Sequence, residues 1–277
     1  MPGQRSSVML LAKLSCPVFA AYAQDVTLFV GQSWKPFGSL RLPRLTSLTI
    51  TIHATGVSGR LTFRGLRALL QCFLRVDSLR TLVISVPGKH HLPAIILATP
   101  TYCLVSFTFT YDGLSEVTKL DGLFKAVGPY LYDLTLHLHS PFTGLGKKDR
   151  IQDLSLCAFP NLCRLKLDVK HWRGETHLVR LLGSLPQPAK LLQVDIVVEG
   201  IRDLEAEVWA GVHDKLTSMG EPPMLHIEIF FDSQSLIDKY EPFVCSLFDS
   251  VMPFYHEVFS FELICPTGAH KYVGVRE

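Results

Sequence analysis

The stretches GPYLYDLTLHLHS at residues 128–140 and AFPNLCRLKLDVK at residues 158–170 follow one design. Each contains a proline in a turn, an apolar anchor, two further residues, and then three apolar positions that alternate with other residues. The apolar positions are Leu131, Leu134, Leu136 and Leu138 in the first stretch, and Leu162, Leu165, Leu167 and Val169 in the second. Because successive side chains of a strand point to opposite faces, the alternation predicts a strand with one apolar face.

The same pattern recurs along the chain at intervals of roughly thirty residues, which indicates a repeat architecture. There are eight copies in all, preceded by a weaker first strand at Val26, Leu28 and Val30. The other six copies have their apolar positions at Leu45, Leu48, Ile50 and Ile52; Leu79, Leu82, Ile84 and Val86; Leu104, Phe107, Phe109 and Tyr111; Leu191, Val194, Ile196 and Val198; Met224, Ile227, Ile229 and Phe231; and Val258, Phe261, Leu263 and Cys265.

Between the predicted strands the apolar residues follow the helical period instead. Such stripes run through 63–74, 114–124, 178–185 and 201–216. The last of them has Trp209 beside it, which we expect in the core. A further helix at 235–252 would be started or interrupted by Pro242.

Strand, crossover and strand again leave neighbouring strands parallel. We therefore predict an α/β fold, a degenerate right-handed solenoid similar to leucine-rich repeats, with a parallel sheet on the concave face and helices or turns on the convex face. Its divisions would be an N-terminal amphipathic helix over 1–24, the solenoid over 25–266 and a C-terminal tail over 267–277. The alternative, an open doubly wound sheet, requires strands that are apolar on both faces, whereas the outward positions here are polar.

Several phrases of the chain resemble the leucine-rich-repeat region of F-box proteins of mushroom-forming fungi. They are Phe19-x-x-Tyr22-Ala23 before the first strand, FKAVGPYLYDLTLHL at 124–138, IQDLSLCAFPNLCRLKL at 151–167 and LEAEVWAGVHDKL at 204–216. The resemblance covers roughly residues 19–266 and implies a substrate-recognition role in a ubiquitin ligase. Fewer residues precede Phe19 than an F-box needs, so we expect this chain to lack the F-box. Two questions stay open: whether this chain still binds a Skp-type adaptor, and whether an F-box lies upstream in a longer product.

Composition limits the other classes of function. The chain has 277 residues, 48% of them hydrophobic, and 27 basic residues against 25 acidic ones for a formal net charge of +2. It can bury a large core, and it lacks the basic cluster that nucleic-acid binding and anionic-membrane binding require. We therefore expect a protein target, with neither nucleic acid nor membrane as partner, and a monomeric chain.

Cysteine usage predicts a reducing compartment. The seven cysteines are spread along the chain without a CxxC pair, and Asn161, the only asparagine, is not in a glycosylation sequon. We expect reduced core cysteines and a cytoplasmic or nuclear protein. The apolar segment at 8–23 is similar to a signal peptide, but Lys13 and Pro17 interrupt it, so we interpret it as the amphipathic helix.

The outward residues of the predicted strands form rows on the concave face, where solenoids commonly bind partners. We expect Lys166 to pair with Asp195 across strands, and Lys170 with Glu199. Two interpretations stay open: these charges only solvate the face, or its carboxylates, with Phe230 and Ile264, bind a basic peptide that has an apolar anchor. The candidate partner-binding residues are His137, His139, Lys166, Asp168, Lys170, Asp195, Glu199, Glu228, Phe230, Asp232 and Glu262.

The sequence offers little for catalysis. His137 and His139 share one strand face, and Asp112 or Asp168 would complete a zinc site, but two polar residues on a solvent-facing strand need no metal. No GxSxG elbow and no nucleotide-binding glycine loop occur. We predict a protein-interaction module without cofactor or enzymatic activity. The alternatives are a free-standing repeat scaffold without a ubiquitin-ligase role and, behind it, a hydrolase-like α/β enzyme.

Overall fold

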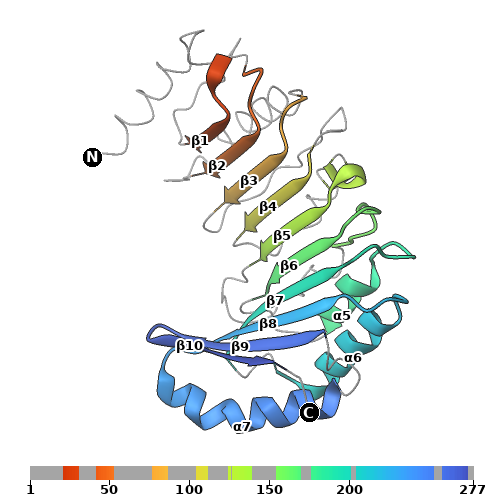
Figure 1. The fold of residues 1–277 in the computed structure, drawn as a ribbon, viewed down its shortest axis with the longest axis vertical. Helices are drawn as coiled ribbons and strands as arrows, with labels where there is room; N and C mark the ends of the chain where they lie inside the picture. Colours follow the sequence, from red (N-terminus) through yellow and green to blue (C-terminus); the bar gives the residue numbers. More distant parts are fainter. Residues whose placement is uncertain are drawn as a thin grey trace, which may run out of the picture.

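The computed structural model describes residues 21–30, 42–52, 77–86, 104–111, 124–125, 127–138, 154–169, 176–200, 204–252 and 258–273. These residues build one open sheet of ten strands, which lie side by side in chain order (Figure 1). Strands β1 to β9 are parallel, and β10 is antiparallel to β9. The strands are β1 (Asp25–Val30), β2 (Ser47–Ile52), β3 (Thr81–Val86), β4 (Ser106–Tyr111), β5 (Asp133–Leu138), β6 (Arg164–Asp168), β7 (Gln193–Glu199), β8 (Met224–Phe230), β9 (Phe259–Cys265) and β10 (Gly268–Val273).

All nine predicted strands are therefore confirmed, and so is their parallel pairing. The predicted C-terminal tail over 267–277 is wrong for Gly268–Val273, which form strand β10. Its glycine and the Pro266-Thr267 turn before it form a short reversal that pairs Gly268 with Cys265. A two-residue turn of this kind can reverse a strand without any helical crossover.

The alternation of the strands separates a buried face from a polar one. In β4, Phe107 and Phe109 are completely buried, while Thr108 between them is only half-buried. Equivalent inward residues of the neighbouring strands, such as Leu134 and Leu136 of β5, join the same hydrophobic core. Burial of this apolar face is the main force that holds the strands in register, because a slip of one residue would expose all of it.

The chain enters six of the strands, β2 to β7, through one repeated backbone motif. The carbonyl oxygen of Tyr132, for example, accepts hydrogen bonds from the amides of both Cys163 and Arg164, at 2.8 and 2.9 Å. Two amides facing one carbonyl are the pattern of a β-bulge, which adds one residue to a strand. The other carbonyls that accept two amides in this way belong to Gln24, Thr46, Arg80, Val105 and Cys163.

Tight turns precede several of these bulges. The amide of Leu45 bonds to the carbonyl of Leu42, and that of Leu162 to the carbonyl of Phe159, at 3.1 and 3.4 Å. In both turns proline is the second residue, where its fixed φ is favourable. The turn at Gly128–Tyr130, a short 3-10 helix labelled η2, closes in the same way with the amide of Leu131.

Side chains tie successive turns together. Asn161 Nδ2 donates to the carbonyl of Pro129 at 2.8 Å, and Lys190 Nζ donates to Asn161 Oδ1 at 2.8 Å. Ser78 links two turns in the same way earlier in the chain, because its hydroxyl donates to the carbonyl of Pro43 at 3.1 Å. These bonds satisfy turn carbonyls that the sheet cannot reach.

Three helices are described over their full length: α5 (Thr176–Gly183), α6 (Ala206–Thr217) and α7 (Gln234–Val251). They confirm the helices predicted over 178–185, 201–216 and 235–252, and Trp209 of α6 is a core residue as expected. Pro242 lies inside α7 and does not begin or interrupt it. Because Pro242 and Asp238, one turn earlier, are both exposed, water can satisfy the carbonyl that proline leaves without a donor.

Other predictions fall outside the described residues. They are the helix over 63–74, most of the helix over 114–124 and most of the N-terminal helix over 1–24.

Candidate partner-binding face

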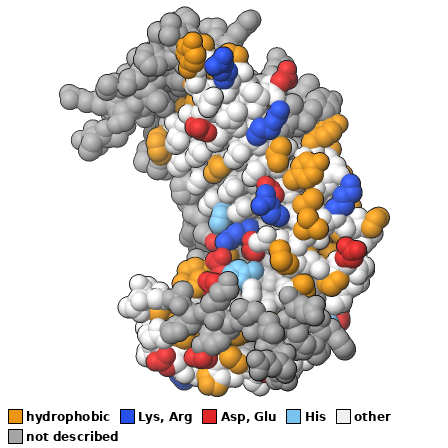
Figure 2. Space-filling view, viewed as in Figure 1, with side chains coloured by type: hydrophobic (Ala, Val, Ile, Leu, Met, Phe, Trp, Pro, Cys, Tyr) orange, Lys and Arg blue, Asp and Glu red, His pale blue; other side chains and the backbone are white. Residues whose placement is uncertain are grey.

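The outward side chains of β5 to β9 make up the polar face of the sheet. One row of register partners runs through Lys166, Asp195, His226 and Ser260. The next row runs through His137, Asp168, Val197, Glu228 and Glu262. Figure 2 shows acidic, basic and histidine side chains close together over these strands.

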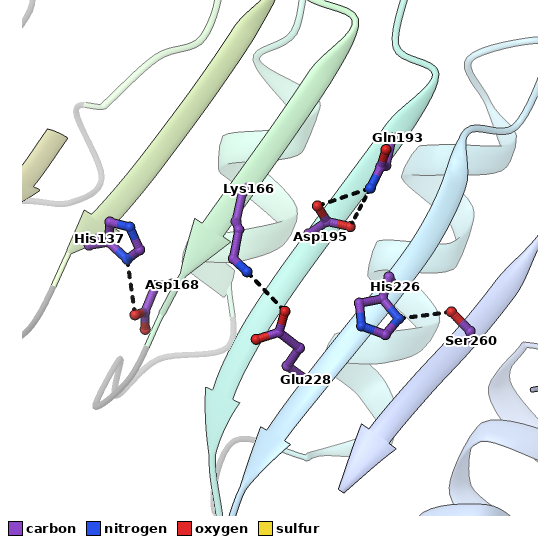
Figure 3. A network of polar contacts seen from close by, with 8 residues as sticks. All are labelled: His137, Lys166, Asp168, Gln193, Asp195, His226, Glu228 and Ser260. Atoms are coloured by element: carbon purple, nitrogen blue, oxygen red, sulfur yellow. Dashed lines mark hydrogen bonds and ion pairs between the residues drawn. The ribbon is translucent and has the colours of Figure 1, made fainter. Parts of the chain in front are cut away.

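Most polar groups of this face are engaged with one another (Figure 3). His137 Nδ1 lies 3.1 Å from Asp168 Oδ2, and the carboxylate accepts this hydrogen bond. The pair differs in exposure, because the side chain of His137 is 30% exposed and that of Asp168 only 9%. Asp168 was expected on an exposed face and is buried instead. In register it lies between His137 and Val197, and Val197 is also buried.

Lys166 makes an ion pair across an intervening strand. Its Nζ lies 2.9 Å from Glu228 Oε1, so the side chains bridge from β6 to β8 over β7. The predicted pair between Lys166 and Asp195 is wrong, although the two residues are neighbours in register. The carboxylate of Asp195 instead accepts hydrogen bonds from Gln193 Nε2 at 3.0 and 3.1 Å, and the longer Glu228 side chain reaches the ammonium group.

Two further contacts complete the polar face. His226 Nδ1 is hydrogen-bonded to Ser260 Oγ at 2.8 Å between β8 and β9. At the beginning of β5 and β6, Arg164 Nε and Nη2 donate to the two carboxylate oxygens of Asp133 at 2.6 and 2.9 Å. The hydrogen bonds to Asp133 raise the pKa of Arg164 above its ordinary value.

At the far end of the face an acidic residue and two apolar ones lie side by side. Glu199 of β7, Phe230 of β8 and Ile264 of β9 are partners in register. All three are half-buried, so Phe230 and Ile264 are less exposed than predicted. Asp232 follows the end of β8 and is exposed, beyond the row to which the prediction assigned it.

Several predicted site residues cannot be compared with the structure. His139, Lys170 and Asp112 lie outside the described residues, so the Lys170–Glu199 pair and a two-histidine zinc site stay predictions. Among the residues that are described, no three or more His, Cys, Asp or Glu side chains are grouped to hold a metal ion.

Gln193, His226 and Ser260 take part in the contacts of the polar face but are not among the predicted site residues. The repeat pattern predicts the buried anchor of β8 at Met224, but Met224 is 54% exposed and Leu225 is buried. The reason is local: within the part of the chain that is described, β8 lacks the double amide contact that precedes β2 to β7, so its alternation runs unbroken from Leu225. The unbroken alternation of Leu225, Ile227 and Ile229 is visible in the sequence and places His226 on the polar face.

Comparisons with protein-family models, with curated proteins and with solved structures find no match to this chain. None of the described helices has the length and apolar character needed to cross a bilayer.

Proposed function

We propose that this chain is a protein-interaction module whose polar face, over β6 to β9, binds a basic segment of a partner protein. The observation that carries the proposal is the excess of carboxylates on that face. Among the described side chains of this face over β6 to β9, Arg164 and Lys166 are the only arginine and lysine, and Lys271 of β10 is the register partner of Glu262. The carboxylates of the face, including one at its far end, are those of Asp168, Asp195, Glu199, Glu228 and Glu262.

The position of Phe230 and Ile264 supports an apolar anchor in the same partner segment. These two side chains are half-buried neighbours, and Glu199 lies next to Phe230 in register. An apolar side chain placed against them would lose water contact, while a cation beside it would meet the carboxylate. Such a combination of a desolvated centre and a charged surround is typical of interface hot spots.

The contacts within the polar face limit the affinity that we expect for a basic partner segment. A partner cation would compete with Lys166 for Glu228 and with Gln193 for Asp195. Because these pairs are already formed in the free protein, part of the gain from binding is offset. The proposal therefore implies a moderate affinity that weakens when salt screens the charges.

The architecture that we propose is a solenoid of the leucine-rich-repeat kind. Nine parallel strands in chain order and the bulge repeated before β2 to β7 support it. In the F-box proteins that the sequence resembles, such a region captures substrates, and we propose that role here. A free-standing scaffold is the alternative.

A peptide titration tests the binding proposal. Fluorescein-labelled peptides with two to four arginines around a central leucine are titrated with the full chain, and fluorescence anisotropy is measured. We expect saturable binding that the double variant Glu228→Lys with Glu262→Lys weakens at least tenfold. Glu207→Lys on the exposed side of α6 changes the charge in the same direction and should leave binding within twofold. Equal binding to the wild type and to the double variant would overturn the proposal.

The ligase role has a separate test. The tagged chain is purified from its own cells, and the co-purifying proteins are identified by mass spectrometry. Recovery of a Skp-type adaptor together with a cullin supports substrate recognition for a ubiquitin ligase. Their absence from a preparation that retains other partners would leave the free-standing scaffold as the function.

A further inference from the structure

Large apolar side chains line the edge of the sheet at which β4 to β8 begin. We call Val105, Tyr132, Leu192 and Met224, together with Tyr130, the edge stripe. Their exposed fractions are 36%, 49%, 62%, 54% and 42%, in that order. Figure 2 shows hydrophobic side chains gathered along this side of the molecule, with basic side chains beside them.

The repeated bulge explains why Val105, Tyr132 and Leu192 are exposed, whereas Met224 begins β8, for which no double amide contact is found among the described residues. Val105, Tyr132, Cys163 and Leu192 each occupy the position directly before a strand, where two successive amides face one carbonyl. The extra residue breaks the alternation, so the side chain before the strand is not carried into the core. One side chain per strand is presented at the edge as a result.

The backbone bonds beside the stripe run from strand to strand, and β6 contributes the half-buried Cys163 between Tyr132 and Leu192. The amide of Tyr132 bonds to the carbonyl of Val105, that of Cys163 to Tyr132, that of Leu192 to Cys163, and that of Met224 to Leu192. Neighbouring strands are about 4.8 Å apart, so the stripe from β4 to β8 is about 19 Å long. Exposed apolar patches of this kind mark interaction sites.

We propose that the edge stripe binds one amphipathic α-helix of a partner protein, with acidic residues along the flank of that helix. The geometry favours a helix, since one helical turn rises about 5.4 Å and nearly matches the spacing of the stripe. About 13 residues of helix would cover its length. Apolar residues at i, i+3 or i+4, and i+7 would then contact successive side chains of the stripe.

Charge indicates the acidic flank. Lys190 is exposed two residues before Leu192, and within the described parts of the chain its ammonium group is bonded to the neutral amide oxygen of Asn161 alone. Arg164, the first residue of β6, is engaged with Asp133. Among the described residues the ammonium group of Lys190 has no anionic partner, so a carboxylate of the bound helix can pair with it.

The test uses a designed probe. A stapled helix of four turns carries leucines on one face and glutamates on the flank, and its binding to the full chain is measured by fluorescence anisotropy. We expect Leu192→Asp and Tyr132→Asp to weaken binding at least tenfold, and Lys190→Glu to weaken it about threefold. Phe243→Asp replaces an equally exposed apolar residue on α7 and should bind as the wild type does.

Three results would overturn the proposal. The first is that the Leu192→Asp and Tyr132→Asp variants bind the probe as tightly as the wild type does. The second is that a proline-containing peptide, which cannot form the helix, binds the wild type as tightly as the probe does. The third is that a helix with lysines in place of the glutamates binds more tightly than the probe. Sedimentation of the chain alone supplies a fourth: a dimer that Leu192→Asp dissolves would assign the stripe to self-association. Melting curves confirm that each variant is folded. A negative result with this probe would not contradict the proposal that the polar face binds a basic segment, because Glu228→Lys is not expected to alter binding of this probe.

Discussion

The backbone of Gly128 lies so close to the carbonyl oxygen of Ala158 that a Cβ at Gly128 would overlap it. The contact joins the turn before β5 to the turn before β6. Glycine is needed here for close approach of two backbones rather than for an unusual φ.

We therefore expect Gly128→Ala to lower the free energy of unfolding by about 1–3 kcal/mol, the usual cost of overpacking. Urea denaturation followed by circular dichroism measures the change. Gly183→Ala is the matched control, because its Cβ would meet only the flexible end of Lys215, at 3.4 Å from Cε. A Gly128→Ala variant as stable as this control would contradict the packing of the two turns.

Trp209 links α6 to α7 within the core. It is completely buried, and its ring meets that of Phe248 edge to face, with centroids 5.5 Å apart. Removal of so large a side chain leaves a cavity, so Trp209→Ala should cost about 3–5 kcal/mol in thermal or chemical unfolding. Phe243→Ala, on the exposed side of α7, should cost less than about 1 kcal/mol. Similar losses for the two variants would show that α6 does not pack as described.

Double-mutant cycles test whether Lys166 and Glu228 interact energetically as an ion pair and are not merely neighbours. We expect Lys166→Met and Glu228→Gln to show a coupling energy of about 0.5–1 kcal/mol in the free energy of unfolding. The cycle of Lys166→Met with Asp195→Asn should show no coupling, because the carboxylate of Asp195 bonds to Gln193. The first coupling should also fall when about 1 M salt is added, because salt screens the charges. A larger coupling energy for Lys166 with Asp195 than for Lys166 with Glu228 would show that the ion pair forms between the register partners instead.

The pKa values of two cysteine thiols are shifted in opposite directions, so the two thiols should lose their protons at different pH. The hydrogen bond with Thr267 lowers the pKa of the Cys265 thiol, with Sγ 3.1 Å from Oγ1. Burial, followed by the charges of Glu241 and Asp249, raises the pKa of Cys245. A lowered pKa means that the thiolate forms at lower pH, so the pH of half-maximal alkylation should be lower at Cys265 than at Cys245.

Alkylation with a small reagent, quantified at each site by mass spectrometry, measures both midpoints in the intact protein. Thr267→Val removes the hydroxyl and should move the midpoint of Cys265 upward while that of Cys245 stays in place. Coinciding midpoints in the wild type would contradict the assignment.

Local patterns account for what could be predicted of the fold. Apolar alternation with a period of two located nine strands, because only strands can bury every second residue. The spacing of helical stripes located α5 and α6. Even the interval of three between an anchor such as Leu131 and the next buried residue, Leu134, was visible in the sequence. Its cause, a bulge that faces two amides to one carbonyl, was not.

The sequence by itself determined the alternating apolar face of the strands, apart from the anchor of β8, and the order in which the strands follow, since both depend on residues close together in the chain. Only the tertiary structure decided which polar groups meet. Lys166 and Glu228 are 62 residues apart, and their contact depends on side-chain length and on competition from Gln193, which no local pattern encodes. The burial of Asp168 and the exposure of Leu192 were decided in the same way, by neighbours that folding brings together from distant strands and turns.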